Sequence, residues 1–222
     1  MATTAEVRRC TRLRGEPMRG RAAPERDSMS GTTNERKEFM HYLSHYESPL
    51  GAMTMASDGE HLTGLWFDGQ KYDRSTIDDD AVLQPRLPVF TQTAQWLDAY
   101  FEGADPGFTP PIRVEGSDFK KMVSSTMLSI PFGATSTYAR IAAEVARRMG
   151  RKQMSAQAVG GAVGRNPITL IVPCHRVLAS DGSLRGYAGG VDRKERLLEM
   201  EGVNMSGLST PPAADDGGGR RE

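Results

Sequence analysis

The sequence has little cysteine and no long hydrophobic run. Its 222 residues include two cysteines, Cys10 and Cys174, and four histidines. Two thiols are too few for a disulfide framework, and the clustered ligands of a structural zinc site are missing. No apolar stretch approaches the ~20 residues that cross a bilayer, and the N-terminus lacks the apolar core of a secretory signal. We therefore expect a soluble cytoplasmic protein with a reduced thiol and no metal.

Net charge is also absent, but the total of zero conceals a division along the chain. Residues 39–118 contain 4 Lys/Arg against 13 Asp/Glu, whereas residues 119–201 contain 13 Lys/Arg against 6 Asp/Glu. An acidic half beside a basic half is typical of a segment that binds a polyanion joined to one that does not. The alternative is chance clustering of charges on solvated faces.

Composition and hydrophobic periodicity divide the chain into four parts. Two are tails without apolar periodicity, an Arg/Ser/Thr-rich start and a Pro/Gly/Asp-rich end, and both are predicted to be disordered. The first tail could instead precede the true start of the protein, at Met29 or Met40. Between the tails we predict a small α/β domain and a mostly helical domain, and therefore an α/β (α+β) fold. The predicted boundaries are 1–38, 39–116, 117–205 and 206–222.

Turn signals and helical spacing predict the elements of the two central parts. In the first part, turn signals at 48–51 and 57–60 separate short apolar runs and indicate an antiparallel meander, followed by a helix over 91–102. In the second part, Ser155 can cap a helix of small residues that follows an amphipathic helix. That sequence outlines a helix-turn-helix, although many helical hairpins share the outline. The helices of the second part are predicted at 118–129, 138–149, 156–163 and 191–200.

The most distinctive local feature is the run IVPCHRV, which places Cys174 between a proline and the pair His175-Arg176. Nearby positive charge stabilises a thiolate, and the thiolate is the nucleophilic form of cysteine. A buried structural cysteine is the alternative, because free cysteine is among the most buried residue types. The neighbouring histidine and arginine count against it, because neither suits an apolar core unless paired. The run therefore favours a reactive thiol.

This run resembles the active-site signature of the O6-alkylguanine-DNA alkyltransferases, also called methylated-DNA–protein-cysteine methyltransferases. Further motifs follow in that family's order and spacing: PFG at 131–133, AVGGA at 158–162, RNP at 165–167 and GYAGG at 186–190. The resemblance is strong over about 117–202 and weak over 42–103. It implies DNA repair by irreversible transfer of an alkyl group from O6 of guanine to Cys174, with O4 of thymine left open. It also implies a monomer that binds double-stranded DNA and needs no cofactor.

The resemblance assigns roles residue by residue. Cys174 is expected to accept the alkyl group, while His175 and Glu195 form a relay, through a water in that family, that takes the thiol proton. Tyr138 resembles the tyrosine that donates a proton as guanine leaves. From the residues alone, Glu195 could instead be an exposed partner of a neighbouring basic residue, and Tyr138 a packing residue. The expected substrate-pocket residues are Asn166, Pro173, Val177, Tyr187, Ala188 and Gly189.

The resemblance also implies that the target base is flipped out of the duplex and that the second helix of the helix-turn-helix lies in the minor groove. Small residues suit that groove, although they also suit close helix packing. Many family members carry an arginine that fills the gap left by the base, and Gln157 stands at that position here. We expect weaker flipping, or help from Arg151 or Arg165. The expected DNA contacts are Ser155, Ala156, Gln157, Ala158, Gly160, Arg165 and Arg176.

Three other functions remain as alternatives. A lesion-binding module without chemistry would resemble relatives that lack the cysteine, but Cys174 is present in its full context. A cysteine hydrolase would need a histidine facing the thiol from elsewhere, and the other histidines, His41, His45 and His61, all fall in the first part. A sequence-specific transcription factor would need long polar side chains on the second helix, which offers few.

Overall fold

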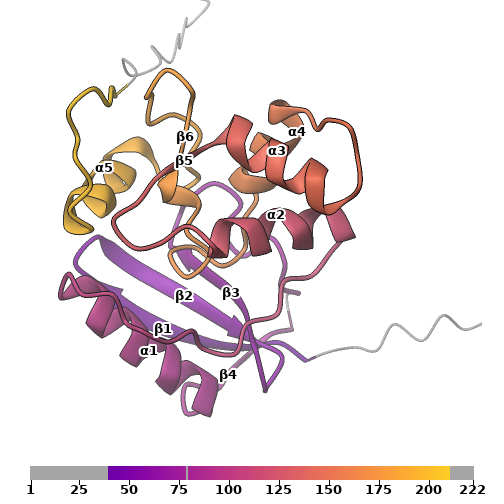
Figure 1. The fold of residues 1–222 in the computed structure, drawn as a ribbon. Helices are drawn as coiled ribbons and strands as arrows, with labels where there is room; N and C mark the ends of the chain where they lie inside the picture. The colour runs from indigo at the N-terminus through magenta and orange to yellow at the C-terminus, as the bar shows by residue number, and fades with distance from the viewer. Residues whose placement is uncertain (1–39, 79, 211–222) are drawn as a thin grey trace, which may run out of the picture. The chain divides into compact units, whose positions relative to one another are not determined.

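The computed structural model describes residues 40–78 and 80–210 of the chain (Figure 1). The tail predicted at 1–38 lies outside the described residues, as does the end of the predicted C-terminal tail from residue 211. None of the helices in the described ranges is long and apolar enough to cross a membrane.

The first part folds as the predicted meander. Three strands pair antiparallel in sequence order, and a short fourth strand pairs parallel to the first, which gives the order β3-β2-β1-β4. The turn between the first two strands needs Gly51, whose φ is +116°, because a side chain is strained in that conformation. The strands are β1 (Tyr42–Ser48), β2 (Gly51–Ser57), β3 (Leu62–Phe67) and β4 (Val82–Leu83).

Helix α1 (Pro88–Phe101) contacts β1, β2 and β3 and lies along one side of the sheet (Figure 1). It begins three residues before the predicted start, because Pro88 occupies the first turn, where its missing N–H costs nothing. One face of the helix is fully buried and includes Leu97 and Tyr100. This packing carries the last turn of α1 toward the second part of the chain.

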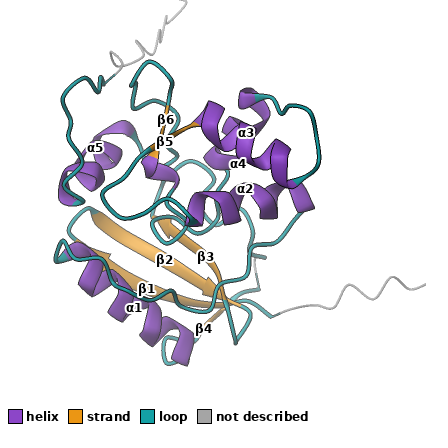
Figure 2. Cartoon of the chain, viewed as in Figure 1, coloured by secondary structure: helices purple, strands orange, loops and turns teal. Residues whose placement is uncertain are grey.

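The second part contains the predicted helices, close to their predicted limits (Figure 2). Each of the first three begins at a hydroxyl residue, Ser117, Thr137 or Ser155, whose side chain accepts a hydrogen bond from a backbone N–H of the first turn. These three helices contact one another. The four helices are α2 (Asp118–Leu128), α3 (Tyr138–Arg148), α4 (Ala156–Gly164) and α5 (Val191–Met200).

The segment between α4 and α5 connects the two parts. Leu65 of β3 exchanges backbone hydrogen bonds with Pro167 and Thr169, at 2.8 and 2.9 Å. The chain then enters a short 3-10 helix, η1 (Cys174–Arg176), and the strand β6 (Val177–Leu178), which pairs parallel with β5 (Ser136–Thr137). The reactive run is therefore held between the edge of the sheet and the start of α3. One hydrophobic core includes side chains from both parts.

The predicted start of the C-terminal tail at Ser206 is wrong. The backbone of Ser209 accepts a hydrogen bond from Leu184 at 3.0 Å and donates one to Gly182 at 3.2 Å. Leu208 packs on the small cluster that contains Leu198. The hydrogen bonds of Ser209 and the packing of Leu208 together hold this segment against the folded part.

Candidate active site

Cys174 lies at the first position of η1 and is buried, with 5% of its surface exposed. Its Sγ accepts a hydrogen bond from Asn166 Nδ2 at 3.1 Å. The same amide nitrogen lies 2.8 Å from the carbonyl oxygen of Val172, and Asn166 Oδ1 accepts from the backbone N–H of Ile168 at 3.1 Å. Asn166 therefore braces the turn before the reactive run and also touches the sulfur. Burial raises the pKa of the Cys174 thiol, and the hydrogen bond from Asn166 opposes that rise only in part.

The carboxylate that faces His175 is Glu201. His175 Nε2 lies 2.6 Å from Glu201 Oε1, and both side chains are fully buried. The prediction of Glu195 as the relay carboxylate is wrong, because Glu195 lies on another side of α5 and accepts a hydrogen bond from Thr210 Oγ1 at 3.4 Å. Glu201 sits at the C-cap of α5, directly beside η1.

Several donors converge on the Glu201 carboxylate. Arg176 donates from Nε at 2.7 Å and from Nη2 at 3.0 Å, the backbone N–H of Gly133 donates at 3.2 Å, and Tyr100 Oη donates at 2.7 Å. Burial alone would raise the pKa of Glu201. The hydrogen bonds of His175 and Arg176 and the charge of Arg176 outweigh burial and lower that pKa to about 2, so the carboxylate is ionised.

This arrangement defines the proton positions on His175. Burial lowers the pKa of His175 more than the nearby carboxylate raises it, so the ring is neutral at pH 7. The ionised Glu201 carboxylate can only accept a hydrogen bond, so Nε2 must be the donor and carries the single proton of the ring. Nδ1 then carries the free lone pair, and it has no hydrogen-bond partner within the described part of the protein. The neutral ring is therefore set up to accept a proton at Nδ1.

Arg176 was predicted to contact DNA, and this is wrong. Its side chain is 9% exposed, pairs with Glu201 and donates to the carbonyl oxygen of Ile130 at 2.8 Å. A buried guanidinium in such a network cannot reach phosphate. The positive charge beside the thiol in the sequence serves the relay carboxylate instead.

Tyr138 begins α3, and its Oη lies 3.4 Å from the carbonyl oxygens of Arg185 and Gly186. Burial raises the pKa of Tyr138 to about 12, so the hydroxyl keeps its proton. Gly186 has a φ of +87°, and a Cβ there would come within 2.5 Å of the tyrosine oxygen. The glycine therefore allows the backbone to approach this hydroxyl closely.

Two of the predicted substrate-pocket residues and two of the predicted DNA contacts line one cavity of about 350 Å³. Tyr187 and Ala188 form part of its wall, together with Gly160 of α4 and Arg165 after it. Gly189 is buried behind Tyr187, and a Cβ there would come within 2.6 Å of the tyrosine ring. The predicted contacts on the outer face of α4 are exposed or half-buried: Ser155, Ala156, Gln157, Ala158 and Gly160.

The remaining predicted pocket residues, Pro173 and Val177, are buried beside the reactive cysteine. The carbonyl oxygen of Val177 accepts a hydrogen bond from Lys194 Nζ at 2.6 Å. Lys194 is fully buried, and burial lowers its pKa to about 8. Sequence reasoning missed this lysine because lysine is mostly exposed.

Two family models match most of the chain. Residues 41–114 match the family model of the 6-O-methylguanine DNA methyltransferase ribonuclease-like domain, and residues 118–203 match that of the 6-O-methylguanine DNA methyltransferase DNA binding domain. The chain belongs to the 6-O-methylguanine DNA methyltransferase family. The family resemblance of the run around Cys174 and of its accompanying motifs is thereby confirmed.

Named relatives cover most of the chain. A methylated-DNA–protein-cysteine methyltransferase of Methanosarcina barkeri is 40% identical over 165 residues, which are 74% of this chain and 99% of the relative. One of Mycobacterium bovis is 38% identical and covers 73% of this chain and 93% of the relative. The crystal structure of Mycobacterium tuberculosis OGT in complex with DNA superposes with a TM-score of 0.63 at 37% identity, covering 72% of this chain and 92% of that one.

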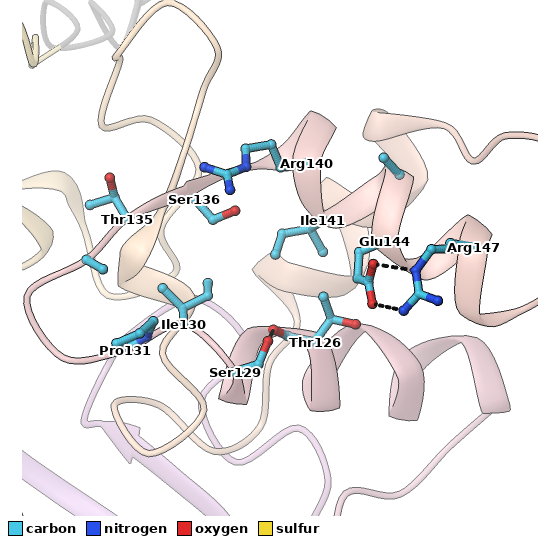
Figure 3. Close-up of a pocket in the computed structure, with 12 residues that line it drawn as sticks. Thr126, Ser129, Ile130, Pro131, Thr135, Ser136, Arg140, Ile141, Glu144 and Arg147 are labelled. Atoms are coloured by element: carbon cyan, nitrogen blue, oxygen red, sulfur yellow. Dashed lines mark hydrogen bonds and ion pairs between the residues drawn. The ribbon is translucent and has the colours of Figure 1, made fainter.

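A second cavity, of about 670 Å³, contains none of the predicted catalytic residues of this methyltransferase-family chain. It lies between the end of α2 and α3, and Figure 3 shows Glu144 and Arg147 facing each other at one end, with Arg140 farther along the helix. Arg147 donates two hydrogen bonds to the Glu144 carboxylate, at 2.9 and 2.7 Å. The cavity is larger than the one at Tyr187, but the reactive groups lie elsewhere.

Proposed function

We propose that this protein reverses alkylation damage by transferring an alkyl group from O6 of guanine in DNA to Cys174. The observation that carries the proposal is the buried arrangement of Cys174, His175 and Glu201, in which a neutral imidazole with a fixed tautomer adjoins the only cysteine of the described ranges. A thiolate formed by proton transfer to His175 Nδ1, through a bridging water, is a strong nucleophile.

The transfer step balances without a cofactor. The Cys174 thiolate attacks the alkyl carbon, a sulfur–carbon bond forms, and the carbon–oxygen bond to O6 breaks. The leaving guanine takes a proton from Tyr138, whose protonated hydroxyl lies at the pocket loop. The relay then returns the thiol proton from His175 to the tyrosine. The thioether product is stable, so each molecule acts once.

DNA binding supports this chemistry. A base must leave the stack before its O6 can be attacked, so we propose that the protein flips the nucleotide into the cavity beside Tyr187. The exposed small residues of α4 can approach the minor groove closely. Arg151, Lys152 and Arg165 are exposed around this helix and can contact phosphates without reading sequence. We infer that the protein works as a monomer in the cytoplasm, where a reducing environment keeps its thiol free.

The test is a single incubation followed by peptide mass analysis. The protein is mixed with a duplex that contains O6-methylguanine, and the peptide that contains Cys174 is weighed. We expect a gain of one methyl group on that residue. Cys174→Ala should abolish transfer and leave binding to the same duplex nearly unchanged. Binding without methyl transfer by the wild-type protein would contradict the proposal and favour a lesion-binding module. A parallel duplex with O4-methylthymine tests whether that base is a second substrate.

A further inference from the structure

One side chain reaches the proton relay from the first part of the chain. Tyr100 lies in the last turn of α1 and is 1% exposed. Its Oη lies 2.7 Å from Glu201 Oε1 and 3.3 Å from His175 Nε2, and those two atoms are 2.6 Å apart. The three polar atoms therefore lie within hydrogen-bond distance of one another.

The direction of each hydrogen bond follows from the charges. Burial and the charge of Glu201 raise the pKa of Tyr100 well above its ordinary value, so the hydroxyl stays protonated and donates to the carboxylate. The oxygen of that hydroxyl can then share the proton of His175 Nε2 as a second acceptor. Both contacts favour the proton on Nε2 and leave Nδ1 as the base.

Packing against other aromatic rings holds the ring of Tyr100 independently of its hydroxyl group. It stacks on Trp96 with ring centroids 5.1 Å apart, and its edge or face meets Phe101, Phe132 and His175 at 5.5 to 6.3 Å. A phenylalanine can make all of these contacts. Substitution by phenylalanine therefore removes the hydrogen bonds and keeps the packing.

We propose that Tyr100 is a positioning residue for alkyl transfer, whose hydroxyl holds the Glu201 carboxylate and the Nε2 proton of His175 in their working arrangement. The inference rests on the proposed function, because it concerns the relay that activates Cys174. The first part of the chain, which contains the four-stranded sheet and α1, would then contribute to the reaction. Its contribution is the hydrogen bond from Tyr100 to Glu201, which the second part cannot make by itself.

The proposal predicts the direction in which loss of the Tyr100 hydroxyl shifts the pH dependence of the transfer rate. The charged and titratable groups around Glu201 and His175 are Tyr100 from α1, Cys174 and Arg176 from η1, Tyr187 from the loop before α5 and Lys194 from α5. Loss of the tyrosine hydroxyl removes a donor from the carboxylate and raises the proton affinity of the Glu201–His175 pair. A base with a higher proton affinity stays protonated, and therefore inactive, up to a higher pH. The midpoint of the acid limb of the transfer rate should therefore move to a higher pH.

The experiment compares Tyr100→Phe with Tyr46→Phe in the full chain. Tyr46 is a matched control, because its hydroxyl donates to Asp98 at 2.8 Å on the surface and does not touch the relay. Single-turnover methyl transfer from O6-methylguanine duplex is measured from pH 5 to 9. For Tyr100→Phe we expect an acid-limb midpoint about one unit higher, the size of one hydrogen bond to a charged group, and therefore a rate about tenfold lower at pH values below both midpoints. Tyr46→Phe should match the wild-type protein.

A third variant tests the role of the Tyr100 hydroxyl if Tyr100→Phe folds poorly. Replacement of Tyr100 by a ring-fluorinated tyrosine keeps the hydrogen bond and makes the hydroxyl a stronger donor, so the midpoint should move downward. Midpoints that stay at the wild-type value in both variants would overturn this inference alone, even if the rates fall with the folded fraction. A wild-type protein that transfers no methyl group would overturn the proposed function and this inference with it.

Discussion

Replacement of Glu201 by glutamine tests which carboxylate serves the relay. Glu201 is fully buried and accepts hydrogen bonds from Arg176, His175 and Tyr100. Glu201→Gln removes the charge and turns an amide group toward the Arg176 guanidinium, which stays buried without an ionic partner. Breaking a buried ion pair in this way costs about 3–5 kcal/mol of the free energy of unfolding.

The pKa of Glu201 gives a second estimate of the free energy of unfolding that Glu201→Gln loses. The ordinary value is 4.5 and the folded value is about 2, and each unit corresponds to about 1.4 kcal/mol, so ionisation contributes about 3–4 kcal/mol. Because the folded pKa is depressed, this stability is fully present above pH 4.5 and is lost as the pH falls toward 2. The wild-type protein and Glu201→Gln should therefore differ by about 3–4 kcal/mol at pH 7 and converge in acid.

The measurement is urea unfolding at several pH values, with single-turnover methyl transfer at pH 7 alongside it. Glu195→Gln is the matched control, because Glu195 lies on the same helix and its carboxylate accepts a hydrogen bond from the exposed Thr210. It should change the free energy of unfolding by less than about 0.5 kcal/mol and leave transfer intact. Loss of transfer in Glu195→Gln together with retention in Glu201→Gln would refute the reasoning.

Three further substitutions test other parts of the site. Asn166→Ala should destabilise the fold by about 2 kcal/mol and slow transfer, because it leaves the buried backbone N–H of Ile168 without its acceptor and removes the donor to Cys174 Sγ; unfolding and single-turnover assays would show both, and unchanged values would contradict the brace. Lys194→Met should raise the pKa of Cys174, since the lysine charge lowers it; alkylation by iodoacetamide against pH measures this, and an unchanged midpoint would exclude that role. Gln157→Arg should tighten binding to O6-methylguanine duplex in fluorescence titration, and equal or weaker affinity would show that this position does not intercalate.

The sequence by itself determined the local structure of this protein. Turn signals predicted the meander, and helical spacing, with a cap at Ser155 for α4, placed α2, α3 and α4 to within a residue or two. These features depend on interactions between residues a few positions apart, which the sequence displays directly. The reactive run around Cys174 was also recognisable from adjacent residues, and the motifs in register indicated the family.

Only the tertiary structure decided which side chains meet at the relay. Glu195 and Glu201 both lie at α5, and the choice between them depends on which part of that helix faces η1. Arg176 follows the cysteine in sequence, but the pairing with Glu201 turns it inward. Tyr100 lies 101 positions from Glu201, and no local pattern links them. Burial makes these distant contacts strong, because a buried charge must find its donors wherever the fold brings them.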